Sequence, residues 1–253
     1  MTILSKISSV LPSLRPGNPY ARPFSRLLSN RLTRGDIVLL KGKFEGEGGD
    51  VVQSKNRPYI VISSDKVMEI TKRIALAPLS TASARFEYEI IIPKNEQTGI
   101  HQPSKVMANQ VGTVFLEDGL VKIGSASSAL AEIDQALAIC FGNFSTKKQL
   151  EISRGDVVEI DFGSYVRSGI IVSNDLGNQA SQIAMLAHSH RKNEAMNEFD
   201  LVVREERCKE ELLVQCYMIN TFNQGFIDKK GRITNADMER ITAMLFKTLG
   251  ITK

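Results

Sequence analysis

One short segment occurs twice in this chain, and the repeat constrains the fold more than any other feature. Arg-Gly-Asp-Ile-Val at 34–38 returns as Arg-Gly-Asp-Val-Val at 154–158. Four further matches follow in the same order, and they pair 57–63 with 167–173, 74–80 with 183–189, 106–113 with 214–221, and a helical segment after Ser127 with one after Thr234. Chance can supply one such match, whereas five in order indicate two tandem copies of one domain.

The pattern of apolar residues predicts short strands followed by one helix in each copy. In copy one, the strands are expected at 36–40, 59–63, 73–79, 88–92, 106–114 and 120–123. Ser127 is a candidate N-cap for the closing helix, whose apolar positions recur with helical spacing at Leu130, Ile133, Leu137 and Cys140. Several short strands with one terminal helix are typical of a strongly curved sheet or a small barrel. The expected fold class is therefore mainly β with terminal helices (α+β).

The repeat also sets the predicted domain boundaries, which are an arm at 1–33, one domain at 34–142, a linker at 143–153 and a second domain at 154–253. The arm holds five basic residues and no acidic ones, so it supplies the excess behind the net charge of +4, while both domains are nearly neutral. Four prolines between positions 12 and 23 forbid a long helix there. The arm is predicted to be a disordered tether, and the alternatives are a phosphate-contacting arm and an organelle transit peptide.

Copy two lacks a loop that copy one has. From Asp36 to Arg57 the chain advances 21 positions, whereas from Asp156 to Arg167 it advances only 11. The extra residues include an acidic, glycine-rich loop at 45–50. Loops on a rigid scaffold commonly carry function, so this difference predicts that copy two has lost function and kept its fold.

The ordered set of motifs resembles the PemK/MazF family of toxin endoribonucleases from bacterial toxin–antitoxin pairs. The motifs are Arg34-Gly35-Asp36, Arg57-Pro58, Pro78 with Ser80-Thr81, Pro103-Ser104, Asn109-Gln110 and Ile123-Gly124. The similarity spans 34–142 and is weaker over 154–250. It implies a small SH3-like β-barrel in each copy. Because family members work as homodimers, it also implies that the tandem copies form an intramolecular pseudo-dimer that is monomeric in solution.

The resemblance implies catalytic residues in copy one. The arginine of the family's Arg-Pro motif becomes Arg57, and its active-site threonine falls on Ser80, with Thr81 beside it. Metal-independent RNA cleavage needs a base, an acid and a cation that stabilises the charged phosphorane. Arg57 suits the last role, because a guanidinium stays protonated and matches phosphate oxygens. Asn109 stands where some members have an acid, so the proton transfers are assigned to loop carboxylates, of which Glu47 is the candidate.

RNA-binding residues are expected in both copies. They are Arg34, Lys55 and Gln110 in copy one, and Arg167, Ser189 and His190 in copy two. Copy two is otherwise expected to be a degenerate partner, with Ser168 and Met218 in place of the family's proline and glutamine. His188 and His190 share one face of a strand, yet no third ligand is recognisable, so no metal and no cofactor are expected.

Together these features predict a sequence-preferring, metal-independent endoribonuclease that cleaves single-stranded RNA (mRNA), with a cognate antitoxin as partner and with DNA binding left open. The alternative is a non-catalytic RNA- or protein-binding module that keeps the fold after losing its acids, and Asn109 and the changes in copy two favour it. Arg57 as a surface salt-bridge partner and Ser80 as a plain strand-end hydroxyl are the structural alternatives for these two residues. A peptide-binding adaptor is disfavoured, because aromatic content is only 6% and Trp is absent. No apolar run is long enough to cross a membrane, and the three cysteines include no Cys-x-x-Cys pair, so a cytoplasmic protein is expected.

Overall fold

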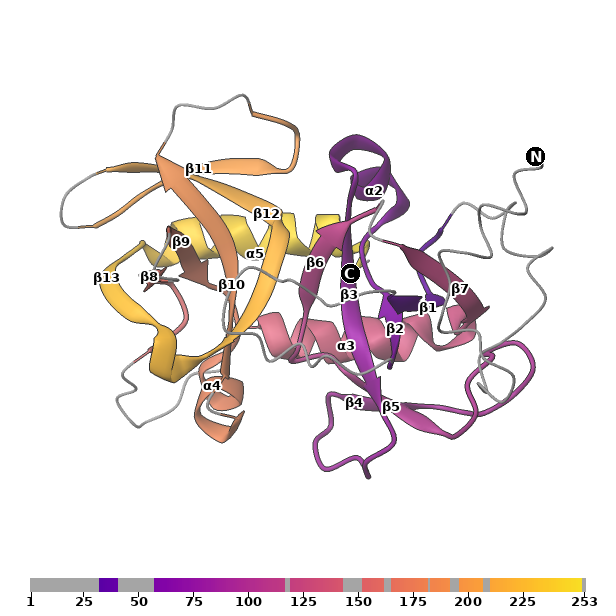
Figure 1. Cartoon of the computed structure of the whole chain (residues 1–253). Helices are drawn as coiled ribbons and strands as arrows, with labels where there is room; N and C mark the ends of the chain where they lie inside the picture. Colours follow the sequence, from indigo (N-terminus) through magenta and orange to yellow (C-terminus); the bar gives the residue numbers. More distant parts are fainter. Residues whose placement is uncertain are drawn as a thin grey trace. The chain divides into compact units, whose positions relative to one another are not determined.

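The computed structural model describes eight stretches of the chain, which are 32–40, 57–116, 119–142, 152–161, 165–181, 183–191, 196–206 and 210–251. Thr33–Lys253 forms one compact unit that contains both copies (Figure 1). Nearly all of the predicted arm and linker lies outside the described residues, as does the acidic loop at 45–50. In the described part of the chain, no helix is long and apolar enough to cross a membrane.

The described residues of copy one form short strands, two α-helices and one 3₁₀ turn. Its elements in order are β1 (Asp36–Leu40), β2 (Pro58–Val61), α2 (Asp65–Thr71), β3 (Arg73–Ser80), β4 (Glu89–Ile92), β5 (Ser104–Met107), β6 (Gly112–Phe115), β7 (Leu120–Ser125), the 3₁₀ turn η2 (Ser127–Ala129) and α3 (Leu130–Phe141). The strands pair in the order β4-β5-β3-β2-β1-β7, and β6 also pairs with β3. All of these pairs are antiparallel.

Copy two repeats this arrangement. Its elements are β8 (Asp156–Asp161), β9 (Val166–Ile171), α4 (Asp175–Ser181), β10 (Ile183–Arg191), β11 (Asp200–Arg204), β12 (Glu211–Asn223), the 3₁₀ turn η3 (Gln224–Phe226), β13 (Asp228–Arg232) and α5 (Asn235–Leu249). The order β11-β12-β10-β9-β8-β13 is that of the equivalent strands in copy one. The predicted duplication and the mainly β fold with terminal helices are therefore confirmed. Neither strand path returns to its first strand, so the structure does not confirm closed barrels.

Three local predictions differ from the structure. The strand expected at 106–114 is interrupted in copy one, where β5 ends at Met107 and β6 begins at Gly112, although its counterpart β12 is continuous. Ser127 begins η2 and does not cap α3, which has no side-chain cap. The short helices α2 and α4 were not predicted, because seven residues are too few to show helical periodicity. Thr234 does cap α5, since its hydroxyl accepts the Asp237 N–H at 3.0 Å.

The repeated Arg-Gly-Asp segment forms the same turn in both copies. Gly35 and Gly155 have φ of +89° and +85°, a backbone conformation that favours glycine. The Asp36 carboxylate then accepts the N–H of Thr33 at 2.9 Å, and Asp156 accepts that of Ser153 at 2.8 Å. The motif is therefore explained by the turn before the first strand.

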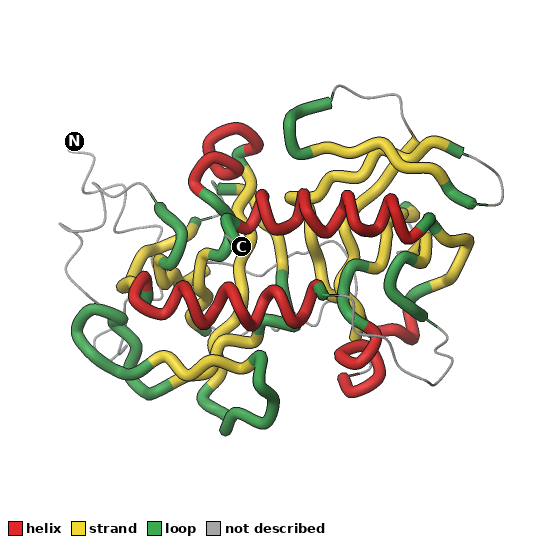
Figure 2. The backbone as a smooth tube through the Cα atoms, turned by 180° about the vertical axis from the view of Figure 1, so that it is seen from behind, coloured by secondary structure: helices red, strands yellow, loops and turns green. Residues whose placement is uncertain are grey.

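The two long helices cover one side of the strands, as Figure 2 shows. Apolar residues recur every three or four positions along α5, at Met238, Ile241 and Leu245, and these side chains are buried. Ile133 and Leu137 of α3 belong to the same core. Because this core also contains strand residues of both copies, the copies share one apolar interior.

Hydrogen bonds between the copies come in equivalent pairs. Thr113 of β6 and Thr221 of β12 occupy matching positions, as do Val111 and Ile219. The Thr113 hydroxyl donates to the Ile219 carbonyl at 3.0 Å, and the Thr221 hydroxyl donates to the Val111 carbonyl at 2.9 Å. Each threonine hydroxyl thus donates to the backbone of the other copy at an equivalent position.

A second pair joins the helix ends to the opposite copy. The Ser64 N–H donates to the Thr248 carbonyl at the end of α5 at 2.8 Å. The Asn174 N–H donates to the Cys140 carbonyl at the end of α3, also at 2.8 Å. Ser64 and Asn174 each precede the short helix of their own copy, so this pair is reciprocal too.

The two threonines allow a matched test of this contact. Thr113→Val is expected to destabilise the protein by about 1–3 kcal/mol, because the Thr113 hydroxyl also accepts the Ile219 N–H at 3.0 Å, and the variant leaves that N–H unpaired. Thr221→Val removes one bond to the Val111 carbonyl and is expected to cost less. Urea unfolding measures both values, and a larger loss for Thr221→Val would contradict this account.

Candidate functional site

Cross-strand pairing brings the predicted Arg57 and Ser80 together. In the antiparallel pair β2–β3, Tyr59 pairs with Pro78. Continuing this register by two residues sets Arg57, which directly precedes β2, opposite Ser80 at the end of β3. Directly opposed residues share one face of a sheet, so the guanidinium and the hydroxyl project from the same face. Both side chains are half-buried, and the predicted Thr81 follows at an exposed position.

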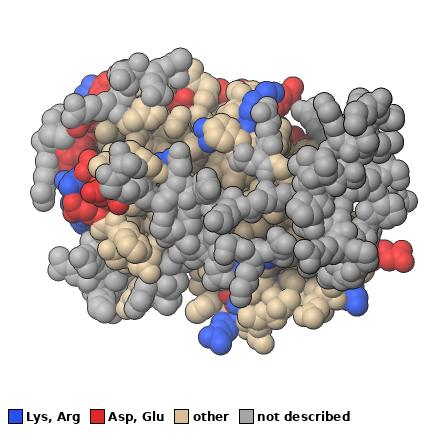
Figure 3. Space-filling model, in the orientation of Figure 1, with Lys and Arg blue, Asp and Glu red and all other residues tan. Residues whose placement is uncertain are grey.

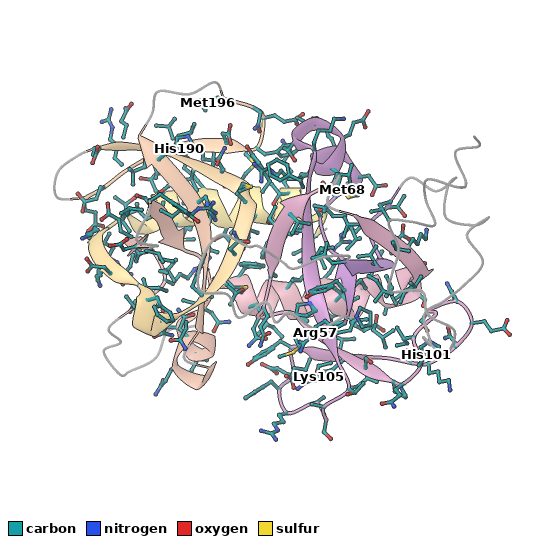
Figure 4. The ribbon with its side chains drawn as sticks, in the orientation of Figure 1. Arg57, Met68, His101, Lys105, His190 and Met196 are labelled. Carbon is teal, nitrogen blue, oxygen red and sulfur yellow. The ribbon has the colours of Figure 1, made fainter. Side chains whose placement is uncertain are left out.

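An ion pair that the sequence did not predict lies beside Ser80. Lys105 of β5 is the cross-strand neighbour of Ser80, and it lies near Arg57 at the same end of β3 in Figure 4. The Lys105 ammonium is 2.6 Å from the carboxylate of Glu89, and both side chains are buried. Lys105 therefore does not present its charge to solvent beside the candidate site.

The Lys105–Glu89 pair holds the loop that follows β3. The Lys105 ammonium donates to the Ser83 carbonyl at 3.1 Å, and the Glu89 carboxylate accepts the Arg85 N–H at 2.6 Å. Burial raises the pKa of Glu89, but the hydrogen bonds from Lys105 and from the backbone outweigh burial and hold that pKa below its usual value. The pair thus fastens the loop at 81–87 from within.

Copy two has an equivalent pair with a different residue opposite the arginine. In the antiparallel pair β9–β10, Ser168 pairs with Ser189. One further step sets Arg167 opposite His190, in the geometry that Arg57 and Ser80 have in copy one. Arg167 and His190 are both half-buried, and burial lowers the pKa of Arg167.

The structure shifts one sequence match by a residue. Matching 74–80 with 183–189 makes Ser189 the counterpart of Ser80. However, the Ala75 N–H donates to the Ser63 hydroxyl at 3.1 Å, and the Met185 N–H donates to the equivalent Ser173 hydroxyl at 2.9 Å. Ala75 therefore corresponds to Met185 and not to Ala184, so the alignment of β3 with β10 shifts by one residue along the whole strand. His190 is the counterpart of Ser80.

Ser189 lies on the other face of β10. It is buried, and it follows Ala187 by two positions, so the two side chains lie on the same face of the strand. Ala187 belongs to the apolar core that also contains residues of α5. Its hydroxyl has no hydrogen-bond partner among the described residues. The structure thus separates Ser189 from Arg167 and His190, with which it was grouped as an RNA-binding residue.

His188 connects the two copies as a neutral imidazole. The Asn220 carboxamide oxygen accepts the Thr113 N–H of copy one at 2.9 Å, so its nitrogen is the atom that faces His188 Nε2, at 3.0 Å. That nitrogen can only donate, so His188 Nε2 carries no proton. Burial, followed by the nearby charges of Arg167 and Arg73, lowers the pKa of His188 to about 3. His188 is therefore a structural group near neutral pH.

Two arginines near His188 lie over aromatic rings. The Arg73 guanidinium carbon is 3.6 Å from the centre of the Phe115 ring, and that of Arg167 is 5.5 Å from the centre of the Tyr165 ring. Both rings are exposed. Arg73 and Phe115 belong to copy one, and sequence reasoning missed them because nothing in the local sequence shows that the start of β3 reaches copy two.

Arg34, predicted to bind RNA, has structural partners. Its guanidinium donates to the Ile62 carbonyl at 3.2 Å and forms an ion pair with Asp134 of α3. In copy two, the equivalent Arg154 donates to the carbonyl of Val172. The shared pattern shows that this arginine ties the first turn to the end of the second strand.

The remaining predicted residues lie apart from this pairing or outside the described residues. Gln110 is half-buried in the turn between β5 and β6, where its N–H donates to the Met107 carbonyl at 3.0 Å. Glu47 and Lys55 lie outside the described residues. The roles of all three stay predictions.

The described residues contain no group of three His, Cys, Asp or Glu side chains placed to hold a metal ion. Figure 4 shows His101 and His190 well apart, at different ends of the strands. Cys140 and Cys216 are buried, and burial raises the pKa of both thiols, which makes them poor ligands and poor nucleophiles.

Positive charge is not gathered into one surface patch on the face shown in Figure 3. Among the described residues visible there, Lys and Arg side chains lie at separate places and are interspersed with Asp and Glu. This agrees with the nearly neutral composition of both copies. On this face, therefore, the described residues offer no broad basic surface of the kind that binds nucleic acid without local contacts.

Comparison with known proteins identifies the family of the chain. The model of the PemK-like, MazF-like toxin of type II toxin–antitoxin systems matches the chain twice, at 33–141 and at 153–249. A comparison with curated proteins found no match.

Several solved structures resemble part of the chain. A mycobacterial endoribonuclease in complex with its cognate antitoxin is 21% identical, with a TM-score of 0.36, and the match covers 40% of this chain and 98% of that one. MazE–MazF from Deinococcus radiodurans is 11% identical (TM-score 0.36; 41% and 100% covered). The Mycobacterium tuberculosis toxin MazF-mt6 is 19% identical (TM-score 0.32; 41% and 92% covered). Because the family model matches most of the chain in two successive segments, this chain belongs to the PemK-like, MazF-like toxin family and carries two tandem copies of its domain.

Proposed function

We propose that this protein is a sequence-preferring, metal-independent endoribonuclease that cleaves single-stranded RNA, and that it acts as the toxin of a type II toxin–antitoxin system. The observation that carries the proposal is the opposition of Arg57 and Ser80 at the ends of β2 and β3. A fixed cation next to a hydroxyl is an arrangement that binds a phosphodiester. Membership of a toxin family that matches both copies supports the same activity.

The chemistry divides among residues of copy one. Arg57 binds a non-bridging phosphate oxygen and stabilises the negative charge that grows as the 2′-hydroxyl oxygen attacks phosphorus. The hydroxyls of Ser80 and Thr81 orient the phosphate by donating hydrogen bonds. Glu47 is assigned the proton transfer. Each of these roles is a prediction that substitution tests.

The proposal includes a pseudo-dimer and an antitoxin. The reciprocal bonds of Thr113 and Thr221 support an intramolecular counterpart of a two-fold dimer, with the chain monomeric in solution. One of the similar structures is described as a complex with its cognate antitoxin, which supports a protein partner of that kind here.

Incubation of a long single-stranded RNA with the purified protein in EDTA tests the proposed activity. Discrete fragments are expected, and one set of them is expected to disappear with Arg57→Ala, because the variant removes the cation from copy one. Circular dichroism and thermal unfolding establish that both proteins are folded. If folded wild-type protein gives no fragments, or if Arg57→Ala changes none of them, the proposal is wrong.

A non-catalytic RNA- or protein-binding module is the second candidate, and the place of Asn109 favours it. Asn109 stands where some relatives were expected to have an acid, and it lines a small pocket with Cys140 and with Asn174 of copy two. Its side-chain oxygen is buried with no hydrogen-bond partner among the described residues. Binding of RNA in the same buffer, without cleavage, would establish this second candidate.

A further inference from the structure

The two copies present different chemistry at equivalent positions. Continued by two residues in copy one and by one in copy two, the strand register sets Arg57 opposite Ser80 and Arg167 opposite His190. A serine hydroxyl needs a separate base before it can take part in proton transfer. An imidazole accepts and releases protons near neutral pH by itself. Copy two therefore combines a cation with a proton-transfer group.

Copy one contributes a second cation to the same place. Arg73 lies over Phe115, two residues along β6 from Thr113, whose N–H donates to the Asn220 carboxamide that contacts His188. Burial first, and then the nearness of Arg167 and Arg73, lowers the pKa of His188, and His190 follows His188 by two residues on the same face of β10. These four side chains thus form one cluster, and the Thr113–Asn220–His188 hydrogen bonds hold it together across the two copies. Two guanidinium groups beside an imidazole are suited to a phosphodiester.

Among the residues that the structure describes, the cluster has no counterpart around Ser80. The positions equivalent to Arg73 and Phe115 are occupied in copy two by Ile183 and Asn223, as the pairing of β3 with β6 and of β10 with β12 shows. An apolar residue and an amide replace the cation and its ring. At these described positions, therefore, the site of copy two has a cation and a ring that the site of copy one lacks.

Exposed rings complete this surface. Phe115 beneath Arg73 is 51% exposed, and Tyr165 beneath Arg167 is 37% exposed. Unpaired bases of single-stranded RNA stack on such rings, and neighbouring arginines bind the phosphates between them.

We propose that copy two is a second RNA-cleaving site, with His190 as its proton-transfer residue; this rests on the proposed function. Arg167 and Arg73 bind the scissile phosphate, so the site is completed by both copies. Phe115 and Tyr165 stack on the flanking bases.

The reaction step balances without a metal or a redox partner. His190 accepts the proton of the 2′-hydroxyl as the oxygen forms a bond to phosphorus and the bond from phosphorus to the 5′ oxygen breaks. The leaving oxygen takes a proton from water, and the resulting hydroxide takes the proton from His190. The products are a 2′,3′-cyclic phosphate and a 5′-hydroxyl end.

The test separates the two sites by working in an Arg57→Ala background, with the same long RNA in EDTA. Fragments that survive Arg57→Ala are expected, and they define the activity of copy two. Adding His190→Asn is expected to slow their formation by about 100-fold or more, because loss of a general base costs that much. Adding Arg73→Ala is expected to slow the same fragments, although Arg73 belongs to copy one. Arg204→Ala is the control, because it removes an equal charge from an exposed pair with Glu211.

Each outcome discriminates. If the wild type cleaves RNA and Arg57→Ala leaves no fragments, the endoribonuclease stands and the second site is overturned. If fragments survive Arg57→Ala but His190→Asn does not slow them, His190 is not the proton-transfer residue. If folded wild-type protein cleaves nothing, both proposals fail. Thermal unfolding of every variant shows whether a loss of cleavage reflects a loss of fold.

Discussion

Replacing Lys105 by Met is expected to destabilise the protein by about 3–5 kcal/mol in urea unfolding at neutral pH. The Lys105 and Glu89 side chains are only 7% and 4% exposed. Met keeps most of the side-chain volume, but it leaves the Glu89 carboxylate buried without its cation. A buried charge that loses its partner costs much more than an intact pair contributes, because desolvation is no longer offset.

The loss from Lys105→Met is expected to depend on pH. In the wild type the pKa of Glu89 is below its usual value, so the pair contributes stability above the usual pKa and loses it as the pH falls through the lowered one. In the variant, burial without a cation raises the pKa of Glu89 instead. The deficit is therefore expected to be largest at neutral pH and to shrink in acid, where Glu89 takes up a proton.

Two further variants separate this cause from others. Glu89→Gln combined with Lys105→Met removes the buried charge and is expected to recover part of the lost stability, since the amide oxygen still accepts the Arg85 N–H. Arg204→Met breaks the exposed pair with Glu211 and is expected to cost less than about 1 kcal/mol. Equal losses in Lys105→Met and Arg204→Met would show that burial of the first pair has no energetic consequence.

The Lys105→Met substitution is also expected to affect the candidate site at Arg57 and Ser80. The pair holds the loop at 81–87 through Ser83 and Arg85, and that loop begins with Thr81 directly after Ser80. Loosening it is expected to reduce the cleavage that depends on Arg57. The candidate site in copy one thus relies on a buried ion pair that no motif reveals, because Lys105 and Glu89 are 16 residues apart and meet only through β4 and β5.

The fold could be predicted where local chemistry was repeated. Gly35 and Asp36 return as Gly155 and Asp156 because the same turn requires a positive φ and a carboxylate that accepts a nearby N–H. The turn can be predicted from a single sequence, because the residues that determine it lie within a few positions of one another. The turn that interrupts the strand expected at 106–114, in which the Gln110 N–H donates to the Met107 carbonyl, could not be predicted in this way, because the equivalent strand β12 is continuous and has no such turn.

The register of β10 shows why the site was harder to predict. The sequence match aligned Ser189 with Ser80 because the two letters agree. Pairing with β9 decides the register in the folded chain, and a shift of one residue moves every side chain to the opposite face. His190 therefore faces Arg167, and Ser189 faces the core.

Contacts between the copies could not be predicted from the sequence alone. Arg73 is the first residue of β3, and its local context shows only a charge at a strand end. Its effect on His188 arises because the two copies pack together, which brings residues more than 100 positions apart into one cluster. The neighbours of Arg73 in copy two therefore cannot be predicted from the sequence around Arg73.

His188 makes this packing sensitive to acid. The pKa of His188 is lowered to about 3 in the folded protein, so the unfolded chain takes up a proton near pH 6.5, before the folded one does. The neutral imidazole thus contributes stability above pH 6.5, and that contribution is lost as the pH falls toward about 3. One proton taken up only by the unfolded state gives a slope of at most about 1.4 kcal/mol per pH unit.

His188→Asn is expected to flatten this slope. The amide does not titrate, and its oxygen can accept the Asn220 amide in place of His188 Nε2. At pH 7 the variant is expected to be less stable than the wild type by about 1–3 kcal/mol, because the smaller side chain leaves a gap. The difference is expected to narrow in urea unfolding between pH 7 and pH 4.5, where only the wild type loses the contribution of a buried imidazole. His101→Asn, which removes an exposed imidazole, is the matched control. Parallel curves for wild type and His188→Asn would contradict a neutral His188. Converging curves would mean that His188 becomes protonated in acid, so that its Nε2–H and the Asn220 amide N–H, both donors, oppose each other. Acid would then weaken the hydrogen bonds that link Thr113 of copy one to His188 of copy two.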